Sequence, residues 1–239
     1  MKFYSSIAKN YDYIFPIQPA QVKWVAQFLQ DDFNWLDIGC ATGKLPVALA
    51  SHTKNVVGID LDEELLSIAH DRNEADNIVF QQGNMLKLKE DFKSNEFDVI
   101  TCLGNTLVHL NTVEELQKFF SDSYDLLNEG GKLLVQVINY DRILDKKIDG
   151  LPTVNNEHVE FIRNYHYSEA KHLIDFETKL TIKETSEVID NSVWLYPLRR
   201  KEVEQMVKES GFSKIDFFGS FKEDELSSET IPMIFVCRK

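Results

Sequence analysis

The segment from Asn34 to Asp60 constrains the fold of this chain more than any other. An apolar run ends at the acidic Asp37, a turn with Gly39 and Gly43 follows, and after a helical stretch a second apolar run ends at Asp60. Glycine lets the backbone turn and approach a ligand closely without a side-chain clash. Two parallel strands joined by a helix form the nucleotide-binding unit of doubly wound α/β proteins. The segment therefore predicts a nucleoside site at this turn.

The two acidic residues indicate which nucleoside the turn would take. Asp60 follows Gly39 by about 20 residues, the separation at which a carboxylate meets the two hydroxyls of a bound ribose. Asp37 stands beside the turn, where it would repel the phosphates that a dinucleotide places on backbone N–H groups at a helix start. S-adenosylmethionine carries an ammonium and a sulfonium and no phosphate, so it suits this carboxylate. The alternative is an ordinary strand-turn-helix that binds no ligand.

The composition argues against several classes of partner. The chain has 239 residues and a net charge of −13, whereas nucleic acids and anionic membranes require basic faces. It shows no leader-like apolar segment at its start and no apolar run near the ~18 residues of a membrane span. Cys40, Cys102 and Cys237 follow no pairing pattern. We therefore expect a cytoplasmic protein with a small-molecule partner, no nucleic acid and no membrane.

The hydrophobic pattern predicts an α/β fold with an insert. Core strands are expected at residues 34–37, 55–60, 78–82, 96–103, 132–137, 214–218 and 232–237. Partial alternation with interleaved charges predicts antiparallel strands at residues 157–167, 172–183 and 187–196. The predicted fold class is α/β: a doubly wound, mostly parallel, seven-stranded Rossmann-like sheet with an antiparallel β cap inserted after the fifth strand. We divide the chain into a core of residues 1–150 and 198–239 and a cap of residues 151–197.

Residues 37–43 resemble motif I of the class I S-adenosylmethionine-dependent methyltransferases, whose pattern is acid-x-Gly-x-Gly-x-Gly. Ala41 replaces the middle glycine, which leaves less room in the loop without excluding the ligand. Residues 102–110, 139–144, 195–197 and 219–222 are similar to the glycine N-methyltransferase branch of small-molecule methyltransferases. The similarity covers most of the chain.

The resemblance implies a set of cofactor contacts. Asp60 would bind the ribose, Leu61 would lie against adenine, Asn84 would accept from its exocyclic nitrogen, and the N–H of Met85 would meet a ring nitrogen. Tyr11 would contact the cofactor from an amino-terminal lid. Asn84 as a turn residue and Tyr11 as an aromatic contact of the core are the alternatives. The predicted cofactor-binding residues are Tyr11, Asp37, Gly39, Ala41, Gly43, Asp60, Leu61, Asn84, Met85 and Leu103.

The resemblance also implies an acceptor site. Asn105 would contact the methyl acceptor, and Tyr196 would line its pocket. His109 is the nearest general-base candidate, because the ordinary pKa of histidine suits that task. A satisfied histidine at a helix start is the alternative.

One position departs from the family pattern. The family carries an arginine that grips an amino-acid carboxylate just before its Asn-Tyr-Asp sequence, and here that position is Ile138. An alkyl chain cannot replace a bidentate cation. Ile138 therefore speaks against glycine or sarcosine and indicates a less anionic, larger acceptor. Arg163 or Arg199 from the cap could substitute for the missing arginine.

We therefore predict an S-adenosylmethionine-dependent methyltransferase that moves a methyl group to an N or O nucleophile of a small molecule. The alternative from another class is a non-catalytic regulatory protein that binds S-adenosylmethionine or S-adenosylhomocysteine. Asp37 and Ala41 disfavour a nicotinamide oxidoreductase. No metal is expected, because His158, His166 and His172 follow no usual ligand spacing. The cap could also form contacts between identical subunits.

Overall fold

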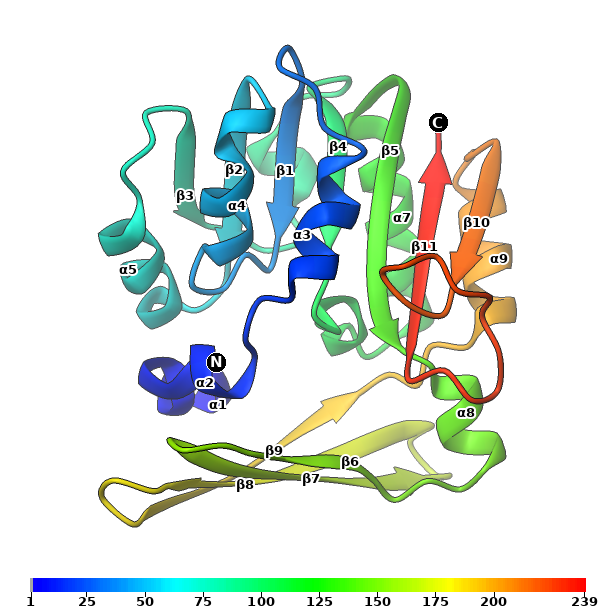
Figure 1. Cartoon of the computed structure of the whole chain (residues 1–239). Coiled ribbons are helices and arrows are strands. Elements are labelled where there is room, and N and C mark those ends of the chain that lie inside the picture. The colour runs from blue at the N-terminus through cyan, green and yellow to red at the C-terminus, as the bar shows by residue number, and fades with distance from the viewer. Residues whose placement is uncertain (1) are drawn as a thin grey trace.

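A seven-stranded sheet forms the centre of the molecule in the computed structural model, which describes residues 2–239 (Figure 1). Its order is β10-β11-β5-β4-β1-β2-β3. Strands β1 to β5 run parallel, β11 runs antiparallel to β5, and β10 runs antiparallel to β11. The strands are β1 (Asn34–Ile38), β2 (Asn55–Asp60), β3 (Ile78–Gln82), β4 (Phe97–Cys102), β5 (Leu127–Ile138), β10 (Lys214–Phe218) and β11 (Pro232–Arg238). The predicted fold class is confirmed.

Helices cover both faces of this sheet. On one face α3, α4 and α5 pack over strand residues such as Trp35 and Val56. On the other face α7 and α9 pack over Leu36 and Phe235. Adjacent strand residues thus face opposite layers, as the two-residue period of a strand requires. The helices are α1 (Lys2–Ile7), α2 (Tyr11–Ile14), α3 (Pro19–Ala26), α4 (Lys44–Leu49), α5 (Glu63–Arg72), α6 (Leu88–Asp91), α7 (Val113–Leu126), α8 (Tyr140–Asp145) and α9 (Arg200–Glu209), with short 3-10 turns η1 (Ala8–Asn10), η2 (Ala50–His52) and η3 (Thr106–His109).

The strand order reverses between β1 and β4. From β1 the chain passes to β2 on one side, and β4 pairs with β1 on the other. Doubly wound sheets bind ligands outside the carboxyl ends of their strands at such a point. These ends face the second sheet and the amino-terminal helices (Figure 1).

A four-stranded antiparallel sheet forms the cap. Its order is β6-β7-β8-β9, with β6 (Gly150–Asn155), β7 (Val159–Ser168), β8 (Leu173–Ile182) and β9 (Glu187–Leu195). Its buried Val159, Phe161 and Leu180 pack against Ile7 of α1 and Ile14 of α2. The amino-terminal helices are thereby held between the cap and the carboxyl edge of the core sheet.

The prediction of three cap strands was incomplete. Strand β6 was missed because it holds Pro152 and only two large apolar residues, Leu151 and Val154. It pairs with β7 alone, and its register shifts between Leu151 and Val154. Proline is tolerated on such an edge strand, where one side needs no ladder hydrogen bonds.

The start of β5 was also predicted wrongly. We expected the fifth strand to begin at residue 132, but α7 ends at Leu126 and β5 begins at Leu127. Gly130 has a φ of +78° within the strand, where the register with β4 shifts. Gly130 and Gly131 therefore belong to an irregular start of the strand.

Candidate active site

The turn after β1 has the backbone that its glycines predicted. Gly39 and Gly43 have φ of +75° and +72°, and a Cβ added to either would lie 2.5 Å from the side chain of Thr106 or Phe80. Ala41 also has a positive φ, +48°, a region that side chains disfavour. Its N–H donates to Asp60 Oδ2 at 2.9 Å, so the carboxylate at the end of β2 holds the loop.

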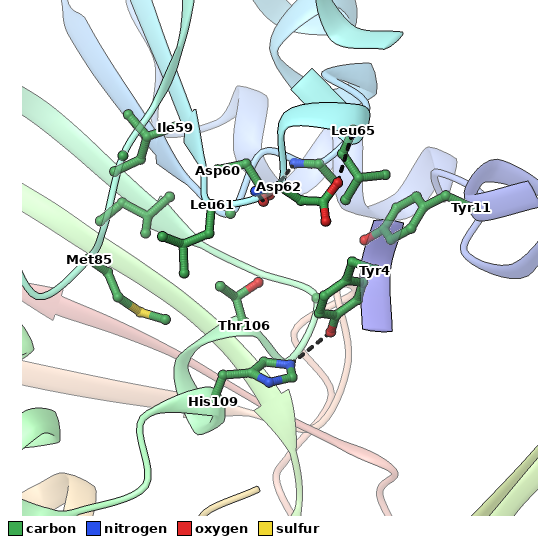
Figure 2. Close-up of a pocket in the computed structure, with 15 residues that line it drawn as sticks. Tyr4, Tyr11, Ile59, Asp60, Leu61, Asp62, Leu65, Met85, Thr106 and His109 are labelled. Atoms are coloured by element: carbon green, nitrogen blue, oxygen red, sulfur yellow. Dashed lines mark hydrogen bonds between the residues drawn. The ribbon is translucent and has the colours of Figure 1, made fainter. Parts of the chain in front are cut away.

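A first pocket, which we call the strand-end pocket, lies against this loop (Figure 2). Leu61 and Met85 line one part of it, and Tyr4 and Tyr11 close it from α1 and α2. It contains seven of the residues predicted from the sequence: Tyr11, Gly39, Ala41, Asp60, Leu61, Met85 and His109. It also contains residues that were not predicted, including Tyr4, Ile38, Asp62, Leu65, Gly104 and Thr106.

Asp60 is half-buried and accepts hydrogen bonds from two backbone donors. Its Oδ2 accepts from Ala41 and its Oδ1 accepts from the N–H of Asp62 at 3.0 Å. Burial raises the pKa of Asp60, and these two hydrogen bonds oppose the rise. Asp62 in turn caps α5 by accepting from the N–H groups of Glu64 and Leu65. The strand end is thus rigidly joined to the loop and to the next helix.

Asp37 lies deeper, at the end of β1, with 4% of its surface exposed. Its Oδ1 accepts from Thr101 Oγ1 at 2.5 Å, and Trp35 Nε1 donates to the same hydroxyl at 2.8 Å. Burial raises the pKa of Asp37 to about 7, although the Thr101 hydrogen bond opposes it. A cation bound nearby would favour the ionised form of this carboxyl group.

A larger cavity of about 500 Å³, the core–cap cavity, continues from the loop toward the cap. It shares Tyr4, Tyr11, Gly39, Ala41, Gly104 and His109 with the strand-end pocket, so the two form one cleft. Predicted residues Asp37, Leu103 and Asn105 line it from the core. On the cap side it is lined by Leu151, Val154, Arg163, Tyr165, Phe176 and Leu195.

The amino-terminal helices are tied over the cleft by polar contacts. The Tyr4 hydroxyl lies 2.8 Å from His109 Nε2 (Figure 2). Asp12 accepts from Thr42 Oγ1 at 2.7 Å and pairs with Arg72 at 2.6 Å and Lys44 at 3.1 Å. These bonds join α1 and α2 to η3, to the glycine turn and to α5, which closes this side of the cleft.

His109, the predicted general base, lies in an environment that changes its acidity. Burial lowers its pKa to about 4, so the ring is neutral near pH 7 and binds a proton weakly. Its Nδ1 is buried and has no hydrogen-bond partner among the residues that the structure describes. The ring stands where the strand-end pocket meets the core–cap cavity, because it lines both.

Asn105 lines the core–cap cavity in a left-handed backbone conformation, with φ of +68°. Its Oδ1 accepts from the N–H of Ile138 at 2.9 Å, and its Nδ2 donates to the Tyr140 hydroxyl at 3.1 Å. The amide therefore joins the end of β4 to the end of β5 and to α8.

Three predicted residues line neither cavity: Gly43, Asn84 and Tyr196. Gly43 packs against Phe80 at the start of α4. Asn84 Oδ1 accepts from the N–H of Leu86 at 2.9 Å, which is the turn alternative weighed above. The Tyr196 hydroxyl donates to Glu202 at 2.6 Å.

Within residues 2–239, no group of three or more histidine, cysteine or acidic side chains could hold a metal ion. His158 and His166 contact different acids, Glu157 and Glu177. A search of the same residues finds no helix that combines the length and the apolar character needed to cross a membrane.

Known proteins match this architecture over most of its length. A family model described as "Methyltransferase domain" matches residues 29–211. The chain belongs to this methyltransferase family. A protein of Geobacillus sp. (strain WCH70) named as a methyltransferase is 31% identical over 209 residues, which cover 85% of this chain and 83% of the relative. The predicted resemblance to S-adenosylmethionine-dependent methyltransferases and the predicted enzyme class are confirmed.

Two further proteins are similar. The glycine/sarcosine/dimethylglycine N-methyltransferase of Actinopolyspora halophila is 28% identical over 214 residues, covering 85% of this chain and 35% of that longer protein. An S-adenosylmethionine-dependent methyltransferase from Clostridium acetobutylicum ATCC 824 has a TM-score of 0.81 at 18% identity and covers 98% of both chains. This second likeness shows the fold.

The side chains at the strand ends suit S-adenosylmethionine, the cofactor of this class. Asp37 and Asp60 place two carboxyl groups beside the loop, which would repel a phosphate and attract an ammonium or sulfonium. Leu61 leaves 38% of its surface exposed at the same edge, an apolar face that a flat adenine would cover.

Proposed function

We propose that this methyltransferase moves the methyl group of S-adenosylmethionine to a nitrogen or oxygen of a small molecule held in the core–cap cavity. The observation that carries the proposal is the continuity of the cleft, which runs from the glycine turn at Asp37 to the inner face of the cap at Tyr165. As part of the same proposal, residues 151–197 act as a cap on a core of residues 1–150 and 198–239.

Asp60, Leu61, Met85 and the loop around Gly39 and Ala41 would hold the nucleoside part of the cofactor. Asp37 and Leu103, which lie toward the core–cap cavity, would hold its amino-acid part. When bound, the cofactor supplies an activated methyl group, so the protein chiefly has to orient the two partners. Orientation alone contributes on the order of 7–11 kcal/mol in favourable cases.

The other residues of the cleft would exclude water and align the acceptor. Tyr4 and Tyr11 cover the loop from α1 and α2, and Asn105 fixes the N–H of Ile138 at the cavity wall. His109 would present a neutral ring to the acceptor and would not hold a proton taken from it, because burial lowers the pKa of the ring to about 4. The acceptor would then release its own proton to solvent, or arrive as a neutral amine.

Nitrogen acceptors are to be tried first. The Actinopolyspora halophila relative is named as an N-methyltransferase of glycine, sarcosine and dimethylglycine. Ile138 stands where the family resemblance implies a carboxylate-binding arginine, so the carboxylates of these three acceptors would need a cation from elsewhere in the cavity.

The test begins with calorimetric titration of the purified protein with S-adenosylmethionine, S-adenosylhomocysteine and NAD. We expect both sulfur nucleosides to bind and NAD not to bind. A screen of amines and hydroxylated metabolites, read by release of S-adenosylhomocysteine, then identifies the acceptor. Binding of both nucleosides with no turnover across a broad screen would favour the regulatory alternative, and NAD binding would overturn the cofactor assignment.

A further inference from the structure

Arg163 occupies a position where a charge is costly. It lies on β7 with Phe161 and Tyr165 two residues away on either side, and both of these are buried. Successive odd positions of a strand share one face, so Arg163 belongs to the inner face of the cap. Arg163 is half-buried on this otherwise apolar and aromatic face, so its charged group gives up part of its hydration.

The guanidinium has few partners inside the protein. Its Nη2 donates to the carbonyl oxygen of Pro152, and its Nε is buried without a hydrogen-bond partner among the residues that the structure describes. No carboxylate of residues 4–239 forms an ion pair with it. Burial lowers the pKa of Arg163, as expected for a cation that lacks a counter-charge.

The charges along the core–cap cavity leave Arg163 uncompensated. Four described residues of its lining are formally charged: Asp12, Asp37, Lys44 and Arg163. Asp12 pairs with Lys44 at 3.1 Å and with Arg72, which lies outside the lining, at 2.6 Å, so the charges of this cluster are engaged within the core. That leaves the Asp37 carboxyl group at the loop end and the Arg163 cation at the cap end, so the cavity suits contents that are positive at one end and negative at the other.

Arg199, the other arginine considered from the sequence, is already occupied. It pairs with Asp141 and with Asp145 at 2.6 Å each, and it does not line the cavity. Ile138 lines the cavity from the core side, where the family resemblance implies an arginine. The cation available to a bound anion is therefore Arg163 on the cap.

We propose that the methyl acceptor carries a carboxylate or phosphate group and that Arg163 binds this group at the cap end of the core–cap cavity. The inference rests on the proposed function and deepens it. The acceptor's anionic end would lie at Arg163, and its nucleophile would then point back toward Asp37 and the cofactor. Arginine offers planar, paired donors that match both oxyanions.

The test uses simple probes, because the acceptor itself is unidentified. The protein saturated with S-adenosylhomocysteine is titrated with benzoate, phenyl phosphate and benzamide, whose ring suits a cavity lined by Tyr165 and Phe176. We expect at least one anion to bind about 10- to 100-fold more tightly than benzamide, the range of a charge-assisted hydrogen bond. The tighter of the two anions tells a carboxylate acceptor from a phosphate acceptor.

In Arg163→Gln the anions and benzamide should bind about equally tightly, and the affinity for S-adenosylhomocysteine should stay unchanged. Arg163→Lys should keep part of it and serves if the glutamine variant fails to fold. The matched control is Arg200→Gln, since Arg200 pairs with Glu204 outside the cavity and should leave the preference intact.

Three results would overturn the inference: equal binding of benzamide and both anions, no binding of either anion, or an anion preference that survives in Arg163→Gln. Each assumes that S-adenosylhomocysteine binds. Failure of the nucleoside itself to bind would sink the proposed function instead, so the two failures are distinguishable.

Discussion

The two ends of the cleft are built in different ways. The strand-end pocket is made mainly by the residues that follow β1 and β2, and its charged groups are the carboxyl groups of Asp60 and Asp62. The cap end of the core–cap cavity is made by strands inserted after β5, and its charged group is Arg163. The carboxyl groups of the first end thus come from a local motif, and the cation of the other end comes from an insertion. A cap can change the acceptor while the cofactor end stays the same.

His109 stands at the border between these two ends and gives the largest expected effect. Its pKa of about 4 lies below the unfolded value near 6.5, so the unfolded chain binds more protons between these two pH values. Stability is therefore fully present above pH 6.5 and falls as the pH drops toward 4, by about 3 kcal/mol. Urea unfolding of the native protein and His109→Gln across this range should show the difference.

The comparison of native protein with His109→Gln is needed because Asp37 changes the stability with pH in the opposite direction. Burial raises its pKa to about 7, so it contributes stability at low pH that is lost as the pH rises toward 7. Asp37→Asn should remove that second slope. Parallel stability curves for native protein and His109→Gln would contradict the buried neutral ring.

At the cofactor end, Asp60→Ala should weaken both S-adenosylmethionine and S-adenosylhomocysteine by roughly 1.5–3 kcal/mol, because a charge-assisted acceptor for the shared ribose is lost. The N–H groups of Ala41 and Asp62 also lose their acceptor, so some stability is lost as well. Calorimetry of both ligands is the measurement. Asp71→Ala, which changes an exposed acid on α5, is the control. Unchanged affinity in Asp60→Ala would remove the ribose assignment.

Asp37 predicts a pH effect on binding at the same end. A cationic ligand favours the ionised carboxylate, so affinity for S-adenosylmethionine should be constant above pH 7 and fall below it, approaching about tenfold per pH unit. Asp37→Asn should flatten this profile. Both ligands carry the ammonium, but only S-adenosylmethionine carries the sulfonium. The same slope for S-adenosylhomocysteine would therefore mean that Asp37 contacts the ammonium, and no slope would mean that it contacts the sulfonium. Native profiles that are flat for both ligands would refute the prediction.

The same contrast explains what the sequence could predict. Gly39, Asp60 and Leu61 lie in one short segment whose conformation is fixed by local rules, and all three line the strand-end pocket. Asn84 was assigned by its place after a strand, but its side chain is used by its own turn. The position of a residue after a strand predicts that it lies at the carboxyl edge of the sheet. It does not predict the direction in which its side chain points.

The cap end depends on pairings that no local pattern encodes. The alternation of Phe161, Arg163 and Tyr165 along β7 indicates that Arg163 faces inward. Only the folded chain shows that no acid of the described residues pairs with it. Tyr4 lies 105 positions from His109 in the sequence, and its contact depends on the packing of α1 under the cap. Tyr196, predicted to line the acceptor pocket, lines neither cavity, and its hydroxyl donates to Glu202 instead.

The smallest effect is expected at Asn105, where the two ends of the cleft can be separated. Asn105→Ala and Asn105→Gly both remove the acceptor for the N–H of Ile138, but only glycine accommodates the φ of +68° without strain. The alanine variant should therefore be the less stable of the two by about 1 kcal/mol in urea unfolding. Both should keep native affinity for S-adenosylmethionine and lose turnover with the acceptor, because the wall altered is that of the core–cap cavity. Weakened cofactor binding in the glycine variant would mean that the two ends are coupled through β4, and the separation between them would fail.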